Sequence, residues 1–97
     1  MDDRSKELER LYEATWQRVK EVVNGSDPEG LLALGFPDDE YDDAVREITR
    51  RLLKGEPTDE MTLSQWFESQ YGARASVAEL VEHLSPIAAD LRGQGDP

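Results

Sequence analysis

Five carboxylates within six consecutive positions are the most conspicuous chemical feature of this 97-residue chain. Carboxylate oxygens are the ligands that hard cations such as calcium and magnesium prefer. An EF-hand loop counted from Asp38 needs glycine at its sixth place and glutamate at its twelfth, where this chain has Asp43 and Thr49. The EF-hand loop is therefore excluded, and only an irregular cation site stays open. The five acids are Asp38, Asp39, Glu40, Asp42 and Asp43.

Two other interpretations fit the same acidic cluster. Acidic side chains in the first turn of a helix stabilise its positive end, so the simplest role for the cluster is helix capping with a solvated outer face. The cluster would also attract a basic protein, because residues 24–43 contain seven acids and no base. Such a potential speeds the association of oppositely charged partners. We keep both interpretations beside the cation site.

The aromatic residues of the third predicted helix are candidates for a contact surface. Trp66, Phe67 and Tyr71 follow helical spacing, which is more typical of core positions. Neighbours on a helix point about 100° apart, so we expect one of Trp66 and Phe67 to be exposed. Aromatic anchors are typical of interface hot spots, and we therefore predict Trp66 and Tyr71 as partner-binding residues.

His83 is the only histidine of the chain, and it lies near Glu79 and Glu82 in the last predicted helix. A general base needs an oriented partner and a concave site, and no serine or cysteine nucleophile stands in a recognisable motif. The chain also lacks cysteine, which excludes disulfides and thiolate metal sites. We predict no catalytic residue and no cofactor.

Composition limits the class of protein further. Charged residues make up 34% of the chain, and the formal net charge of −11 would repel nucleic-acid phosphates and anionic lipids. No apolar run approaches the length of a signal peptide or a membrane span. We predict a soluble cytoplasmic protein that binds neither nucleic acid nor membrane.

Apolar residues recur at steps of three and four in four segments, and no segment alternates with a period of two over more than four residues. The pattern predicts helices over 4–23, 41–54, 62–71 and 76–91, with capping boxes at Thr62 and Ser76. Thr58 is a second, less convincing start for the third helix. Pro86 should kink the last helix near Glu82 or end it. The predicted fold is all-α: a four-helix bundle-like single domain over 1–97, frayed at 1–3 and 93–97.

An additional short helix is expected between the first and second helices. Asp27 and Pro28 have the residue types of a helix entrance, and Gly35 can close a helix two turns later in the left-handed conformation. Phe36 and Pro37 would then form an extended connector. Either Asp38 or Asp39 would cap the next helix.

Residues 27–41, DPEGLLALGFPDDEY, resemble the DP-x-x-L…G-x-P-x-(D/E)-E-Y signature of the YugE-like domain of unknown function, a small family of uncharacterised bacterial helical proteins. Ser26 and Phe36 stand where that family often has tryptophan and alanine. The resemblance implies an all-helical fold and, because relatives occur among immunity-like sequences, protein binding. It implies no catalytic residue. The matching residues are Asp27, Pro28, Leu31, Gly35, Pro37, Asp39, Glu40 and Tyr41.

These observations favour a small acidic helical protein-binding module, immunity-, antitoxin- or regulator-like, with no catalytic activity. Its partner would be a protein with a basic surface. One alternative is a metal-dependent protein or enzyme that uses the carboxylates of 38–43. Another is a structural homo-oligomer that buries an apolar stripe between copies. The predicted partner-binding residues are Asp38, Asp39, Glu40, Asp42, Asp43, Trp66 and Tyr71.

Overall fold

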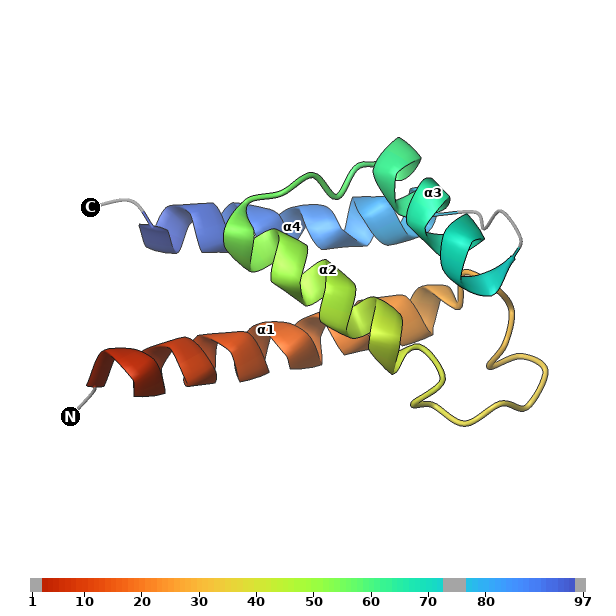
Figure 1. Cartoon of the computed structure of the whole chain (residues 1–97), viewed down its shortest axis with the longest axis horizontal. Helices are drawn as coiled ribbons and strands as arrows, with labels where there is room; N and C mark the ends of the chain where they lie inside the picture. The colour runs from red at the N-terminus through yellow and green to blue at the C-terminus, as the bar shows by residue number, and fades with distance from the viewer. Residues whose placement is uncertain (1–2, 73–76, 96–97) are drawn as a thin grey trace.

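A computed structural model describes residues 3–72 and 77–95, and these ranges contain four α-helices and no strand (Figure 1). This confirms the predicted all-α fold with four main helices. The helices are α1 (Asp3–Ser26), α2 (Asp42–Lys54), α3 (Glu60–Tyr71) and α4 (Ala78–Gly95).

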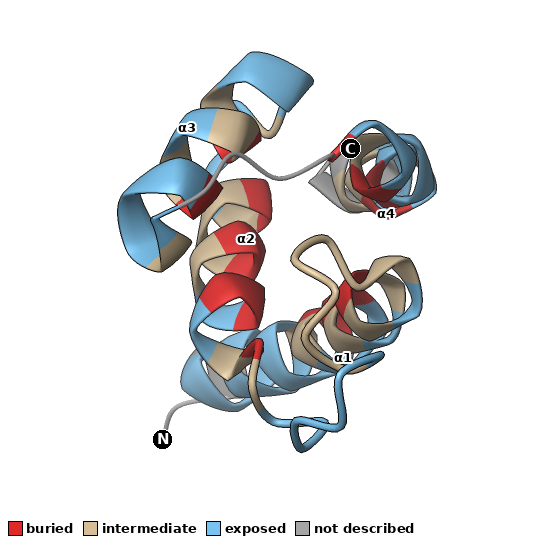
Figure 2. Ribbon diagram, turned by 90° about the vertical axis from the view of Figure 1, so that its right-hand side faces the viewer, coloured by how far each residue is buried: buried red, intermediate tan, exposed pale blue. Residues whose placement is uncertain are grey.

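α1 and α4 lie side by side along the long axis of the molecule, and α2 crosses them and contacts both (Figure 1). α3 lies at the same end of the molecule as the end of α1, beside α2 (Figures 1 and 2). The buried residues of all four helices turn towards the centre, and the outer faces are exposed (Figure 2). The shape is elongated, with extents of 44 × 25 × 20 Å.

The core consists of the periodic apolar positions that the sequence indicates. α2 contributes most, because Ala44, Val45, Ile48 and Leu52 are buried along one face while its charged residues are exposed or half-buried. Burial of each large apolar side chain stabilises the fold by about 1.5–3 kcal/mol. The other helical core residues are Val19, Val23, Leu63, Phe67, Leu80, Leu84 and Ile87.

The N-terminal half of α1 extends beyond this core. Val19 and Val23 are fully buried, but Leu8 is 62% exposed and Tyr12 is 38% exposed. Helical spacing therefore predicts correctly that these residues share a face of α1. Helical spacing does not show, however, that no other helix covers this face over the first turns of α1.

The ends of α2 and α3 agree with the sequence prediction, whereas their starts differ from it, and α1 extends beyond its predicted end at 23 to Ser26. Gly55 and Gly72 adopt the left-handed conformation and close α2 and α3, as predicted. α2 begins at Asp42 without a side-chain cap, so the predicted caps at Asp38 and Asp39 are wrong. α3 begins at Glu60, where the Asp59 carboxylate accepts a hydrogen bond from the Thr62 amide. Because Asp59 is already a strong N-cap, α3 begins before the predicted Thr62 cap. The predicted cap at Ser76 lies outside the described residues.

α4 continues through Pro86, so the alternative in which this proline ends the helix is wrong. Pro86 has no N–H to donate to the carbonyl of Glu82, but its ring lies on the exposed side of α4. The helix also includes positions 93–95, and α1 includes Asp3, all of which we expected to be frayed. Positions 1–2 and 96–97 lie outside the described residues.

Residues 27–41, which we call the 27–41 loop, form a series of turns in place of the predicted short helix. Asp27 has φ 46° and directly follows α1, whereas a helix N-cap has an extended backbone. Gly30, with φ 71°, interrupts the segment that was expected to be helical. Turn hydrogen bonds such as Gly35 N–H to Leu32 O, at 3.1 Å, hold the backbone instead.

Candidate protein-binding site

A tyrosine–aspartate pair closes the 27–41 loop at its two ends. The Tyr41 hydroxyl donates a hydrogen bond to Oδ1 of Asp27 at 2.7 Å and accepts one from the Glu29 amide at 2.8 Å. The Asp27 carboxylate also accepts hydrogen bonds from the amides of Leu32 at 3.1 Å and Ala33 at 3.0 Å. Tyr41 is fully buried and the two bonds at its hydroxyl are partly buried, and together with the amide bonds to Asp27 they fix the path of the loop.

The protonation states of this pair follow from its surroundings. Burial raises the pKa of Tyr41 to about 12, and the hydrogen bond to Asp27 acts in the same direction. Burial also raises the pKa of Asp27, but the hydrogen bonds from Tyr41 and from the backbone amides outweigh it, so the Asp27 pKa lies below its usual value. A neutral hydroxyl therefore donates to an ionised carboxylate over the whole physiological pH range.

The tip of the loop presents apolar and acidic side chains next to each other. Leu34 is 76% exposed and Phe36 is 47% exposed. Asp38 and Asp39 are exposed two and three residues later, and neither forms an ion pair with another described residue. We call these four residues the loop tip. An amide of α1 holds the tip in place, because Asn24 Nδ2 donates to the carbonyl of Asp38 at 2.9 Å.

The structure divides the predicted acidic cluster. Asp42 pairs with Lys20 of α1 at 3.1 Å, and Asp43 pairs with Arg46 at 3.1 Å on the exposed face of α2. Glu40 is half-buried. Nowhere in ranges 3–72 and 77–95 do three His, Cys, Asp or Glu side chains gather as metal ligands. The cluster therefore forms no group of three metal ligands within these ranges, and only Asp42 and Asp43 of its members have ion-pair partners there.

Trp66 and Tyr71 lie in an aromatic cluster that is half-buried against the core. The ring of Tyr71 stacks on Phe67 at 5.6 Å and meets Tyr41 edge-on at 6.1 Å. Trp66 meets Phe67 edge-on at 5.3 Å. Phe67 is fully buried while Trp66 keeps part of its surface in solvent, so these neighbours do differ in exposure.

Tyr71 connects this aromatic cluster with part of the acidic one. Burial raises the pKa of the Tyr71 hydroxyl, and the negative charges of Asp43, Glu40 and Glu29 raise it further. These three acids therefore act on the hydroxyl electrostatically. Tyr71 in turn lies 6.4 Å from Trp66 between ring centroids.

Leu34 and Phe36 are the residues that the sequence interpretation missed. Leu34 was expected to pack within the short helix, and Phe36 to be a connector. A signal was present, because Phe36 stands between Gly35 and Pro37, two residues that interrupt regular structure and favour an exposed turn. A large apolar residue in such a turn is a candidate contact residue.

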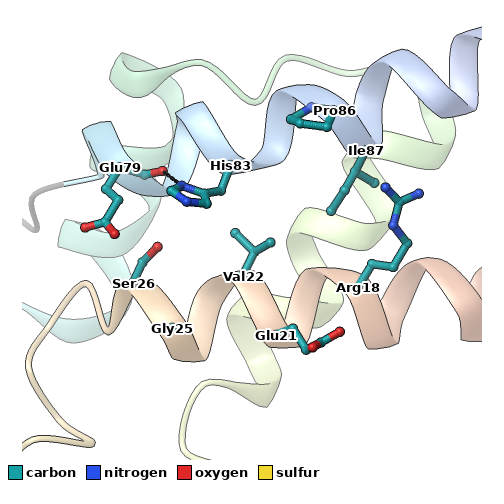
Figure 3. Close-up of a pocket in the computed structure, with 9 residues that line it drawn as sticks. All are labelled: Arg18, Glu21, Val22, Gly25, Ser26, Glu79, His83, Pro86 and Ile87. Atoms are coloured by element: carbon teal, nitrogen blue, oxygen red, sulfur yellow. Dashed lines mark hydrogen bonds between the residues drawn. The ribbon is translucent and has the colours of Figure 1, made fainter.

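His83 lies in a separate cleft of about 410 Å³ between α1 and α4 (Figure 3). Its Nδ1 is 2.9 Å from the carbonyl of Glu79 in its own helix. Within the described part of the chain, no hydrogen bond connects the imidazole to a serine hydroxyl or to a carboxylate. The hydrogen-bonded chain that would activate a nucleophile is thus not formed among these residues.

Comparisons with known proteins add no assignment. No protein-family model matches the chain, and neither the curated proteins nor the solved structures give a significant match. The resemblance to the YugE-like family therefore stays a prediction. Among the described helices, none combines the length and the apolar character needed to cross a membrane.

Proposed function

We propose that this chain is a small acidic protein-binding module, immunity-, antitoxin- or regulator-like, that docks a basic protein and has no catalytic activity of its own. The observation that supports this most is the loop tip, where exposed Leu34 and Phe36 stand beside exposed Asp38 and Asp39, which form no ion pair within the described part of the chain. A fitting partner has an apolar depression with lysine or arginine at its rim.

The two kinds of side chain in the loop tip would contribute differently. Burial of Leu34 and Phe36 in a partner would supply contact energy, about 1.5–3 kcal/mol for each fully buried side chain. Asp38 and Asp39 would accelerate encounter with a basic surface. Because Tyr41 and Asp27 already fix the loop, little further ordering is needed on binding.

Glu40, Asp43, Trp66 and Tyr71 would extend this surface beyond the loop tip. The ion pair of Asp43 with Arg46 is largely exposed, so it is weak and leaves Asp43 available to a partner. Asp42 is the exception among the predicted site residues. Its pair with Lys20 connects α2 to α1, and we assign it a structural role.

The experiment compares the wild-type chain with two variants of equal net charge. The test variant combines Asp38→Lys with Asp39→Lys, and the control combines Glu79→Lys with Glu82→Lys on the exposed face of α4. A partner is captured from native cells, purified, and its binding kinetics are measured at low and high salt. We expect the test variant to lower the association rate about tenfold or more at low salt, and the control to have a much smaller effect.

A third variant tests the apolar part of the loop tip. Leu34→Ser with Phe36→Ser should increase the dissociation rate while the association rate stays nearly constant, because short-range contacts act after encounter. Equal kinetics for the wild type and both loop variants would contradict the proposal. Calorimetric titration with Ca²⁺, Mg²⁺ and Mn²⁺ tests the metal-dependent alternative, and saturable heat together with a higher melting temperature would favour that alternative.

A further inference from the structure

An open apolar groove runs along the N-terminal half of α1. This half of the helix lies at the end of the molecule opposite the 27–41 loop (Figure 1). Leu8, Tyr12 and Trp16 follow one another at intervals of four residues, and Leu53 of α2 closes one side. The groove has a volume of about 750 Å³. We call these four residues and the space between them the α1 groove.

The three α1 residues of the groove form a continuous apolar stripe and are not scattered over the helix. Positions i, i+4 and i+8 stand on successive turns of a helix, each about 40° further round than the last, so their side chains form one slanting ridge. The same face of α1 is fully buried two turns later, at Val19 and Val23. A soluble domain normally covers such a stripe, and a contiguous exposed one is typical of a binding surface.

The charged residues that line the α1 groove are all acidic. They are Glu9 and Glu13, both exposed, and neither forms an ion pair with another residue of the described ranges. Beyond the lining, Nζ of Lys20 lies 4.9 Å from the ring centroid of Trp16 and also pairs with Asp42. Lys6 and Arg10 stand close to the two glutamates in the sequence, but neither forms an ion pair with them. The rim of the groove thus has two carboxylates without an ion pair among the described residues.

We propose that the α1 groove binds an amphipathic helix of a partner protein, with large apolar residues on one face and lysine or arginine beside them. An apolar ridge and groove of helical period are the features that recognise such a segment. The carboxylates of Glu9 and Glu13 select for basic flanks. A second copy of this chain fits less well, because it would bring another acidic rim and another net charge of −11 against the same surface. This surface is separate from the loop tip.

The test uses a labelled synthetic helix of about 18 residues, five turns long, with a leucine stripe flanked by lysine and arginine. Binding to the full chain is measured by fluorescence anisotropy at about 0.15 M salt, where the Debye length is about 8 Å. We expect a Kd on the order of 1–10 µM. A peptide of the same composition without an apolar face should bind at least tenfold more weakly.

Variants of the chain locate the binding. Leu8→Ser with Tyr12→Ser should raise the Kd about tenfold or more, because both apolar contacts are lost. Met61→Ser is the matched control, since Met61 is 70% exposed and lies outside the α1 groove. Asp38→Lys with Asp39→Lys should leave the Kd nearly unchanged, which separates this inference from the proposed function of the loop tip.

A further variant changes only the rim. Glu9→Lys with Glu13→Lys should reverse the preference, so that a peptide with glutamate flanks binds more tightly than the basic one. The proposal is overturned if the scrambled peptide binds equally well, or if neither pair of α1 variants changes the Kd. It is also overturned if light scattering shows a dimer that Leu8→Ser with Tyr12→Ser dissociates, because a second copy would then occupy the groove.

Discussion

Asp27 combines two structural roles at one position. Its amide donates to the carbonyl of Val23 at 2.8 Å and so ends α1, and its carboxylate holds the Tyr41 hydroxyl at the far end of the loop. The left-handed backbone of Asp27 costs about 1–3 kcal/mol for a residue other than glycine. The hydrogen bonds that its carboxylate accepts offset this cost.

We predict that Tyr41→Phe and Asp27→Ala each lower the free energy of unfolding by about 1–3 kcal/mol, because each change leaves a partly buried polar partner unsatisfied. The double variant should lose less than the sum, since both changes remove the same bond. Urea unfolding measures all three values. Asp38→Ala is the control and should change stability by no more than about 0.5 kcal/mol. Additive losses would show that the two side chains do not interact.

The raised pKa of Tyr41 predicts a loss of stability in alkali. The hydroxyl has a pKa of about 12 in the folded chain and an ordinary value near 10 when unfolded. The stabilisation is complete below pH 10 and is lost as the pH rises from about 10 to about 12, because the unfolded chain releases the proton first. Urea unfolding between pH 9 and pH 12 should show this decline. In Tyr41→Phe the decline should be smaller, and an equal decline would contradict the assignment.

The sequence predicts that the 27–41 loop is acidic and contains turns, but it does not predict the hydrogen bonds that hold the loop. The acidic run and the turn-forming residues Gly35 and Pro37 are visible in the sequence. The bond between Asp27 and Tyr41 joins positions fourteen residues apart, and no local pattern encodes it. A helix N-cap was the obvious role for Asp27, because its carboxylate does accept hydrogen bonds from backbone amides. The donors are the amides five and six residues ahead, however, and not amides within one turn.

At the scale of the helices, glycine has opposite effects at two positions. Gly55 has φ 73°, so we predict that Gly55→Ala lowers the free energy of unfolding by about 1 kcal/mol. Gly25 lies within α1, where an added Cβ meets nothing within 4 Å. Gly25→Ala should therefore raise stability by about 0.5–1 kcal/mol. Thermal unfolding of both variants checks the signs, and equal signs would contradict the explanation.

The helices themselves could be predicted because apolar spacing is a property of each segment. The prediction of an extra short helix was wrong, since Gly30 and Asp27 both adopt left-handed conformations that break a helical segment. The starts of the helices are harder to predict than their interiors, because more than one residue can serve as the cap. Asp59 and Thr62 are both acceptable caps, and only the structure shows that Asp59 caps α3.

For the molecule as a whole, the excess of negative charge works against compactness. Interhelical pairs such as Arg18 with Asp90 at 3.0 Å compensate only part of it. We predict that NaCl raises the melting temperature, because the Debye length falls from about 30 Å at 0.01 M to about 3 Å at 1 M and repulsion weakens. Asp38→Asn with Asp39→Asn should reduce this dependence. A melting temperature that falls with salt would show that the ion pairs outweigh the repulsion.

The arrangement of the helices is the part that the sequence could not supply. Periodicity indicates that Leu8 and Val19 lie on one face of α1, but not that the partner helices cover only Val19. The aromatic contact between Tyr41 and Tyr71 likewise depends on how α3 packs over the start of α2. Both proposed surfaces, the loop tip and the α1 groove, result from this arrangement.

The bonds that close the 27–41 loop have one consequence for engineering. They use backbone amides and the side chains of Asp27 and Tyr41, whereas the side chains at 33–39 make no hydrogen bond or ion pair with the described residues. A foreign peptide grafted at 33–39 should thus leave the four helices folded, provided that Gly35 is kept for its φ of 99°. The chain would then display a chosen epitope in a constrained form, as an antibody framework displays a hypervariable segment.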